Sequence, residues 1–333
     1  MLPEKRSRYR RKKTAVLLIG TAVLAVAAVF AAGMWKQVKK SRENREQVSS
    51  ENVKSESREK TGTIYNEHLS NYLFMGIDTR GEAEEANSRN AGQADAIFLV
   101  SINRVTDKIQ VISIPRDTIT EIEAFSVGGK SLGIMKNHIN LQYAQGDGKH
   151  KSCELMKTAV SNLLGGIPIQ GYCSLNMDGI SVMTELVGSV KVTLTDDSLA
   201  EANPDFTEGE EITLTKDNVE QFVRYRDTDK AQSALVRQER QKIFLAAYME
   251  KAQEQYAEDS SFVTKLYKQM TPYMITNMGN DVFVKLLKAT GKSIPSVVTL
   301  PGEGRQGEYY DEYHVDEEAL KELEKQMFYK EDN

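Results

Sequence analysis

The sequence predicts an α/β domain in which helices cover a mixed sheet, preceded by one N-terminal transmembrane helix. Short runs rich in β-branched and aromatic residues alternate with longer segments whose apolar residues recur at helical spacing. Two of the strand-like runs, 96–102 and 109–114, are separated by only six residues, as in an antiparallel hairpin. Near the N-terminus, the twenty-two residues 14–35 carry no charge. Such a run is long enough for a membrane span.

Composition excludes one broad class of function. The chain has 333 residues, of which 40% are hydrophobic, so it can form a sizeable core. Its net charge is −5, which argues against nucleic-acid binding by the chain as a whole. Basic residues are concentrated at the start, where seven of the first thirteen residues are Lys or Arg.

Residues 14–35 predict a membrane anchor. As a helix they span about 33 Å, which matches a bilayer core. The basic flank is expected in the cytoplasm, and Trp35 stands where an interfacial aromatic residue belongs. The alternative is a cleaved signal peptide, because Ala31 and Ala32 resemble small-residue cleavage positions. The apolar run exceeds the roughly 7–15 residues of a signal peptide, so we expect a retained single-pass anchor in the cell membrane.

Four regions follow from these features. We expect a basic cytoplasmic tail at 1–13, the transmembrane helix at 14–35, a polar stalk at 36–68 and a folded domain at 69–333 outside the cytoplasm. Within the domain, β-rich runs predict strands at 72–77, 96–102, 109–114, 172–177, 190–194 and 296–300. Helical periodicity predicts helices at 155–164 and 234–255, and a third that begins with Asp178 as its N-cap and ends at Leu186.

The two cysteines leave two possibilities open. Cys153 lies at the start of a predicted helix and Cys173 in a predicted strand, so their pairing depends on tertiary packing. A disulfide is possible in an oxidising compartment, and two buried free thiols are the alternative. The four histidines are scattered without zinc-ligand spacing, which argues against a zinc site.

Two acidic residues stand at predicted strand ends, where ligand sites of α/β sheets are often found. Asp78 lies in the segment 76–80 after a buried strand, and Asp95 begins the next strand. Two carboxylates brought together there would suit Mg²⁺ or Mn²⁺. Spacing alone favours the alternative, in which Asp78 caps a turn and Asp95 stands at the N-terminal end of a strand.

Arginines predict an anion site. Arg116 and Asp117 follow Pro115 at the exit of the hairpin, where they would form a turn with a surface ion pair if they stood alone. If 223–226 is extended, Arg224 and Arg226 share one face, and Arg237 and Arg240 share one side of a helix. Converging guanidiniums suit phosphate or pyrophosphate. The alternative is a solvated charged face neutralised by nearby acids, which are Asp227, Asp229 and Glu239.

Together these acids and arginines describe a metal-assisted phosphoryl site. The chain has no Walker-type phosphate loop, no G-x-S-x-G elbow and no H-E-x-x-H motif. Nucleoside triphosphate chemistry is therefore not indicated.

At these residues the sequence resembles the LytR-CpsA-Psr family of bacterial cell-envelope proteins. Segment 76–80 is similar to the first acidic motif of the family, and Asp95 with 96–102 is similar to the second. Residues 113–118 match its Pro-Arg-Asp signature, and 136–140 with Tyr143 and Ala144 match its following helix. The family's arginine-rich run is matched by Arg224, Arg226, Arg237, Arg240 and Gln241.

The resemblance implies an α-β-α sandwich around an apolar pocket for a lipid tail, on a domain facing the cell wall. It implies Mg²⁺-dependent transfer of a phospho-glycopolymer, such as teichoic acid or capsule, from a polyprenyl-pyrophosphate carrier to peptidoglycan. By this resemblance Asp78 and Asp95 would hold the metal. Arg116 would act in catalysis. No residue is marked as the general base by its motif, and Asp227 and Asp229 are candidates by their proximity in sequence. The pyrophosphate would be held by Arg116, Arg224, Arg226, Arg237 and Arg240.

Two departures from the family pattern stand out. Ala96 and Ile97 replace the usual Thr and Met, so a hydroxyl beside Asp95 is missing. Residues 232–236 replace the usual Gly-Asp-x-Gly before Arg237. A non-catalytic polyprenyl-phosphate-binding or regulatory membrane protein, or a hydrolase of the lipid pyrophosphate, are the alternatives to a transferase.

Overall fold

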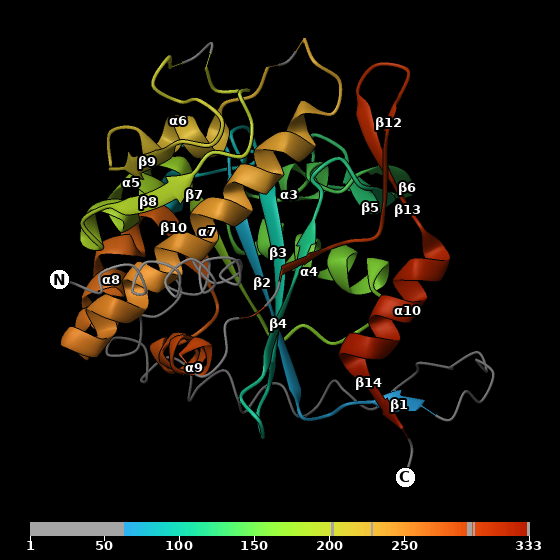
Figure 1. Ribbon diagram of the computed structural model, residues 1–333. Helices are drawn as coiled ribbons and strands as arrows, with labels where there is room; N and C mark the ends of the chain where they lie inside the picture. The colour runs from blue at the N-terminus through green and yellow to red at the C-terminus, as the bar shows by residue number, and fades with distance from the viewer. Residues whose placement is uncertain (1–62, 201–202, 228, 292–294, 296, 332–333) are drawn as a thin grey trace, which may run out of the picture.

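The protein is described here by a computed structural model that covers residues 63–200, 203–227, 229–291, 295 and 297–331 (Figure 1). The predicted cytoplasmic tail, the transmembrane helix and the stalk up to residue 62 lie outside these residues and stay predictions. Within the described part of the chain, no helix combines the length and apolar character needed to cross a membrane.

A six-stranded mixed sheet forms the centre of the molecule. Its strand order is β10-β7-β2-β3-β4-β11. Strand β2 pairs antiparallel with β3 and parallel with β7, and β3 pairs antiparallel with β4, which confirms the predicted mixed sheet and its hairpin. The short edge strands β10 and β11 pair antiparallel with β7 and parallel with β4. The strands are β2 Leu69–Ile77, β3 Ala94–Asn103, β4 Ile109–Ile114, β7 Gly171–Asn176, β10 Met274–Thr276 and β11 Val297–Thr299.

Both faces of this sheet are buried, and each carries its own core. Alternate residues of a strand point to opposite faces, so Phe74 and Phe98 belong to one core while Leu73 and Leu99 belong to the other. Helices therefore cover both sides, with α8 and α9 to the left of the sheet in Figure 1 and α4 and α10 to the right.

The helices of the first core are α5 Met177–Leu186, α6 Val219–Arg224, α7 Ser233–Glu258, α8 Phe262–Met270 and α9 Asn280–Thr290. Those of the second core are α3 Leu141–Ala144, α4 His150–Leu163 and α10 Glu317–Phe328. Two short 3₁₀ turns occur at Ala83–Glu85 and Thr271–Tyr273.

Four two-stranded sheets surround the central sheet. The first joins β1 Thr63–Tyr65 to β14 Tyr329–Glu331. The folded part therefore begins by Thr63, earlier than the expected boundary at 69. The other pairs are β5 Ile119–Phe125 with β6 Ser131–His138, β8 Val190–Thr193 with β9 Glu211–Leu214, and β12 Gly302–Gln306 with β13 Asp311–Val315.

Three local predictions were wrong. Residues 223–226 are not a strand, because Val219, Phe222 and Val223 are buried at helical spacing in α6, which ends at Arg224. The N-cap of α5 is Asn176, whose side chain accepts a hydrogen bond from the Gly179 N–H at 3.2 Å, and not Asp178. Residues 136–138 belong to strand β6, so the helix expected there begins only at Leu141.

The two cysteines are free and buried. The Cys153 thiol lies 3.5 Å from the Ser174 hydroxyl. The Cys173 thiol, in β7, contacts the sulfur of Met274, in β10. The structure thus contains two buried thiols in place of a disulfide.

Candidate active site

Asp95 is the centre of the candidate site. The register of β2 against β3 shifts here, with Gly76 opposite Ala96 and Ile77 opposite Ala94, so Asp95 is the extra residue of a bulge. Its side chain is only 9% exposed and forms ion pairs with Arg116 and Arg237. A bulge near the strand end thus presents a nearly buried carboxylate to two guanidiniums from distant segments.

Arg237, in the first turns of α7, has two hydrogen-bond donors without an acceptor among the described residues. Its Nη1 donates to Asp95 Oδ2 at 3.0 Å, while Nε and Nη2 are buried and have no partner among the described residues. Burial lowers the pKa of Arg237, the Asp95 carboxylate opposes that change, and the charges of Arg116 and Arg226 add to it. Buried donors without acceptors are costly, so these two positions are ready for an anionic ligand.

Arg116 is held from three sides. Its Nη2 donates to Gln93 Oε1 at 2.8 Å, its Nε donates to Asp117 Oδ1 at 3.2 Å, and its Nη1 pairs with Asp95. Gln93 Oε1 also accepts from Asn140 Nδ2 at 2.9 Å. The guanidinium plane of Arg116 is therefore fixed before any ligand arrives.

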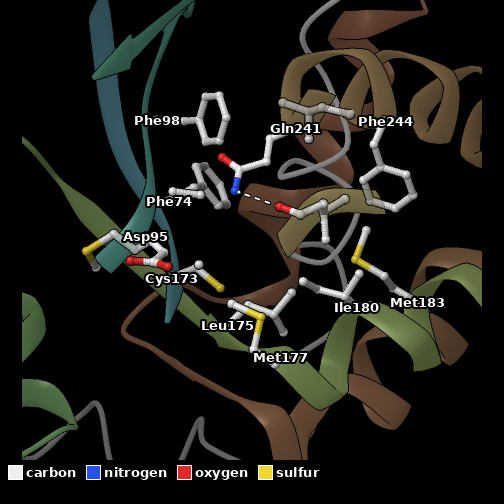
Figure 2. Close-up of a pocket in the computed structure, with 15 residues that line it drawn as sticks. Phe74, Asp95, Phe98, Cys173, Leu175, Met177, Ile180, Met183, Gln241 and Phe244 are labelled. Atoms are coloured by element: carbon white, nitrogen blue, oxygen red, sulfur yellow. Dashed lines mark hydrogen bonds between the residues drawn. The ribbon is translucent and has the colours of Figure 1, made fainter. Parts of the chain in front are cut away.

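An apolar cavity of about 90 Å³ adjoins Asp95. We define it by its walls from β2, β3, β7, α5, α6 and α7, which include Phe74, Phe98, Leu175, Ile180, Met183 and Phe244. Figure 2 shows Asp95 next to these apolar side chains, with Gln241 donating from Nε2 to the Val223 carbonyl at 3.1 Å. An acidic residue at the edge of an otherwise apolar cavity suits a ligand with a charged head and an apolar tail.

A polar cleft of about 330 Å³ is lined in part by Arg116. Its walls come from the segment after β4, the end of β6, the loop before α7 and the β12–β13 turn, and include Arg116, His138, Arg226, Asp229, Tyr309 and Tyr310. The polar cleft shares no lining residue with the apolar cavity. The Asp95–Arg116 ion pair is the link between them.

The predicted arginines fall into two groups. Arg226 lines the polar cleft with Arg116, and its charge acts on Arg237. Arg224 is instead 48% exposed on the surface and pairs with Glu220 at 3.0 Å. Arg240 is buried and donates to the carbonyls of Phe222 and Tyr225, so it supports the fold and is not part of the site.

The predicted acidic residues also differ in their surroundings. Asp78 is exposed, and its Oδ1 accepts from the Gln93 N–H at 2.6 Å while no described residue donates to its Oδ2. Asp229 lines the polar cleft. Asp227 pairs with Lys230 at 3.0 Å, and this hydrogen bond lowers the pKa of Asp227.

The two predicted metal ligands, Asp78 and Asp95, differ in how far their carboxylates are engaged. Among the described residues there is no group of three or more His, Cys, Asp or Glu side chains arranged for a metal. Mg²⁺, however, is commonly held by one or two carboxylates together with water and substrate phosphates. No described residue donates to Asp78 Oδ2, which could therefore bind such an ion directly. Both oxygens of Asp95 face arginines, so Asp95 could bind an ion only after it releases one of them.

Sequence reasoning missed several residues of the site. Gln93 stands two positions before Asp95, and no motif marked it, because its role depends on a contact with Arg116. Asp117 was noted only as half of a surface ion pair, yet its side chain is 13% exposed and lies 4.0 Å from His138. Tyr309 and Tyr310 form an adjacent aromatic pair in a turn, which was the one available signal for the β12–β13 contribution.

Relatives of this chain work on cell-wall polymers. A polyisoprenyl-teichoic acid–peptidoglycan teichoic acid transferase TagU of Halalkalibacterium halodurans is 26% identical over 213 residues, 64% of this chain and 63% of that protein. The match thus spans slightly less than two thirds of that relative. The TagU of Bacillus cereus strain ATCC 14579 is 28% identical over 260 residues, 75% of each chain.

The fold also has solved counterparts. The structure of TagT bound to LIIa-WTA superposes with a TM-score of 0.59 at 20% identity, covering 84% of this chain and 95% of that one. At that identity the likeness shows the fold alone. The family model described as the LytR_cpsA_psr family matches residues 31–329, nearly the whole described region. The chain therefore belongs to the LytR-CpsA-Psr family.

Proposed function

We propose that this protein transfers a phospho-glycopolymer, of the teichoic acid or capsule type, from a polyprenyl-pyrophosphate carrier to peptidoglycan. One observation carries the proposal. The Nε and Nη2 donors of Arg237 are buried and unpartnered among the described residues, and Arg237 is paired with Asp95, which lines the apolar cavity. A pyrophosphate would satisfy these donors while its isoprenoid tail enters the apolar cavity. The names of the TagU relatives support the same polymer and acceptor.

The proposed reaction is a phosphoryl transfer. A hydroxyl oxygen of the acceptor attacks the phosphorus that carries the polymer, and the bond from this phosphorus to the bridging oxygen breaks. Polyprenyl phosphate leaves with the electron pair, and the hydroxyl proton passes to a carboxylate. Arg116 and Arg237 neutralise the charge that develops on the phosphate oxygens. Asp229 is the better candidate for the proton acceptor, because it lines the polar cleft beside Arg116, whereas Asp227 is engaged by Lys230.

Mg²⁺ is part of the proposal, with Mn²⁺ as the substitute. Asp78 and Asp95 would hold the ion together with the substrate phosphates. When bound, the ion would neutralise phosphate charge and polarise the phosphorus–oxygen bonds. Asp95 would then have to release at least one arginine, which would free that guanidinium for the pyrophosphate.

The direct test is binding of geranylgeranyl pyrophosphate to the full-length protein by calorimetry. Arg237→Lys should weaken binding by about tenfold or more, because an ammonium cannot replace the planar fork of donors. Arg224→Ala is the control and should leave the affinity unchanged, since Arg224 lies on the surface and its ion pair among the described residues is with Glu220. Equal affinities for wild type and Arg237→Lys would reject the pyrophosphate site.

One observation favours a second candidate, a non-catalytic lipid-pyrophosphate binder. Both oxygens of Asp95 are occupied by arginines, which leaves the carboxylate no free oxygen for a metal. A transfer assay with labelled carrier-linked polymer and peptidoglycan separates the two. The transferase loses product formation in EDTA and recovers it with Mg²⁺, whereas a binder forms no product in either buffer. Release of free polymer without an acceptor would identify a hydrolase.

A further inference from the structure

Two adjacent tyrosines project from the turn between β12 and β13. Tyr309 is 78% exposed and Tyr310 is 73% exposed, and both line the polar cleft. The Tyr310 ring lies against His138 edge to face, with ring centroids 6.4 Å apart. Large aromatic side chains left uncovered at the wall of a cleft indicate a binding surface, because their burial by a ligand is favourable.

The charges in the polar cleft are balanced. Three basic side chains line it, Arg116, Arg226 and Lys230, and three acidic ones, Asp117, Asp229 and Asp311. A site for a phosphate alone would carry an excess of positive charge. Closely spaced donors and acceptors of both kinds instead suit a ligand that is neutral and rich in hydroxyl groups.

The turn that carries the tyrosines is fixed to the candidate active site. The Tyr313 N–H donates to the Asp117 carbonyl at 2.8 Å, directly after Arg116. Asp311 Oδ2 accepts from the Gln232 N–H at 2.7 Å, just before α7 and Arg237. Within the turn, the Gly307 N–H donates to the Tyr310 carbonyl at 2.9 Å. The first and the central residue of β13 are thus tied to the segments that supply the two site arginines.

We infer that the polar cleft is the subsite for the acceptor glycan and that Tyr309 and Tyr310 are its stacking surface. The glycan strand of peptidoglycan is a chain of β-1,4-linked N-acetylhexosamines, whose rings present flat C–H faces and hydroxyl-bearing edges. Such faces stack on aromatic rings, and the hydroxyls meet the acids, amides and guanidiniums of the polar cleft. The inference rests on the proposed function, because the transfer reaction requires an acceptor hydroxyl next to Arg116.

The experiment measures binding of a peptidoglycan tetrasaccharide, prepared with a muramidase, to the full-length protein by ligand-observed NMR titration. Tyr309→Ala should weaken binding by about tenfold, because the stacking face is lost. Tyr309→Phe keeps the ring and should stay within about twofold of wild type. Glu308→Ala is the matched control, since Glu308 is exposed in the same turn and does not line the polar cleft.

A parallel titration with geranylgeranyl pyrophosphate separates this inference from the proposed function. Glycan affinity lost in Tyr309→Ala, with the pyrophosphate affinity of wild type kept, supports the acceptor subsite. If wild type binds no pyrophosphate, the proposed function fails, while the glycan titration still reports on the polar cleft. The inference is overturned if wild type binds no tetrasaccharide, if Tyr309→Ala binds it equally well, or if Tyr309→Ala loses both ligands.

Discussion

At the scale of residues, two arginines three positions apart on α7 have opposite roles. Arg237 has buried donors to spare beside Asp95, whereas Arg240 uses its donors on the Phe222 and Tyr225 carbonyls and on Ser198. Both were predicted to hold pyrophosphate, since spacing along a helix gives the side on which a residue lies. The spacing does not say which neighbouring element that side meets. Only the packing of α7 against α6 and β3 distinguishes the two arginines.

Arg240→Ala should therefore lower stability. The change leaves carbonyls at the end of α6 without donors, and hydrogen bonds to a charged group contribute about 1.5–3 kcal/mol each, so we expect a loss of about 3 kcal/mol or more. Urea unfolding followed by circular dichroism measures it. Arg224→Ala, which removes an exposed pair, should stay within about 0.5 kcal/mol of wild type. Similar losses for the two variants would contradict the structural role of Arg240.

The Cys153 thiol should make the free energy of unfolding depend on pH. Burial raises the pKa of its thiol from an ordinary value near 9 to about 12. Above pH 9 the unfolded chain loses this proton while the folded protein keeps it, so stability falls as pH rises from 9 toward 12. By pH 10 this thiol should have lowered the free energy of unfolding by about 1 kcal/mol.

The measurement compares wild type with Cys153→Ala in urea at pH 8 and pH 10. The variant lacks the titrating thiol, so its stability should fall less between the two pH values. Identical pH dependence in the two proteins would show that Cys153 titrates normally in the folded state.

At the scale of elements, the prediction succeeded where burial leaves a clear pattern in the sequence. Strands β2, β3 and β4 and the β3–β4 hairpin were predicted from short, nearly continuous runs of β-branched and aromatic residues, and α4 from apolar residues that recur at helical spacing. Hairpin β12–β13 was missed, because β12 is mainly exposed and its sequence carries no apolar alternation. Segment 223–226 was considered as extended because Arg224 and Arg226 would then share a face, yet its first two residues end α6, whose face with Val219, Phe222 and Val223 is buried. Tertiary contact, rather than local pattern, fixes these elements.

The turn before β3 supports the predicted acids through Gly92. Its φ is +75°, and a Cβ there would lie 2.4 Å from Thr79 Cγ2 and 2.7 Å from Asp78 Oδ1. Gly92→Ala should therefore displace Asp78 as well as strain the backbone. We expect it to lower polymer transfer by about tenfold or more beyond any loss of stability.

Gly166→Ala is the matched control for this substitution. Gly166 has a φ of +83° with no atom within 4 Å of an added Cβ, so it carries the backbone strain without the clash. Backbone strain should cost each variant about 1 kcal/mol of stability, the clash should add to this loss in Gly92→Ala, and only Gly92→Ala should lose transfer. Full transfer by Gly92→Ala would remove the Asp78 segment from the mechanism.

At the scale of the whole molecule, the sheet separates two cores and only the α5–α7 side carries the apolar cavity at Asp95. The α/β class and both layers of helices were predicted. The cavity was expected only through the family resemblance. An internal cavity forms where side chains from six elements leave space between them, and this depends on their tertiary packing. No local sequence pattern encodes such a space.

Filling the apolar cavity should separate binding of the tail from binding of the head. Ile180→Trp places an indole in the space, so affinity for geranylgeranyl pyrophosphate should fall by about tenfold or more. Affinity for inorganic pyrophosphate should be unchanged. Ile180→Leu conserves volume and serves as the control. Unchanged affinity for the lipid in Ile180→Trp would mean that the tail lies elsewhere.

The separate walls of the apolar cavity and the polar cleft have a kinetic consequence. No residue lines both spaces, so a lipid donor and a glycan acceptor need not displace one another to reach Arg116. Under the proposed function, the two substrates can then bind in either order and react in a ternary complex, with no covalent enzyme intermediate between them. Double-reciprocal plots of initial rates at several fixed acceptor concentrations should give intersecting lines. Parallel lines would instead indicate that the polymer passes through the protein before it reaches the wall.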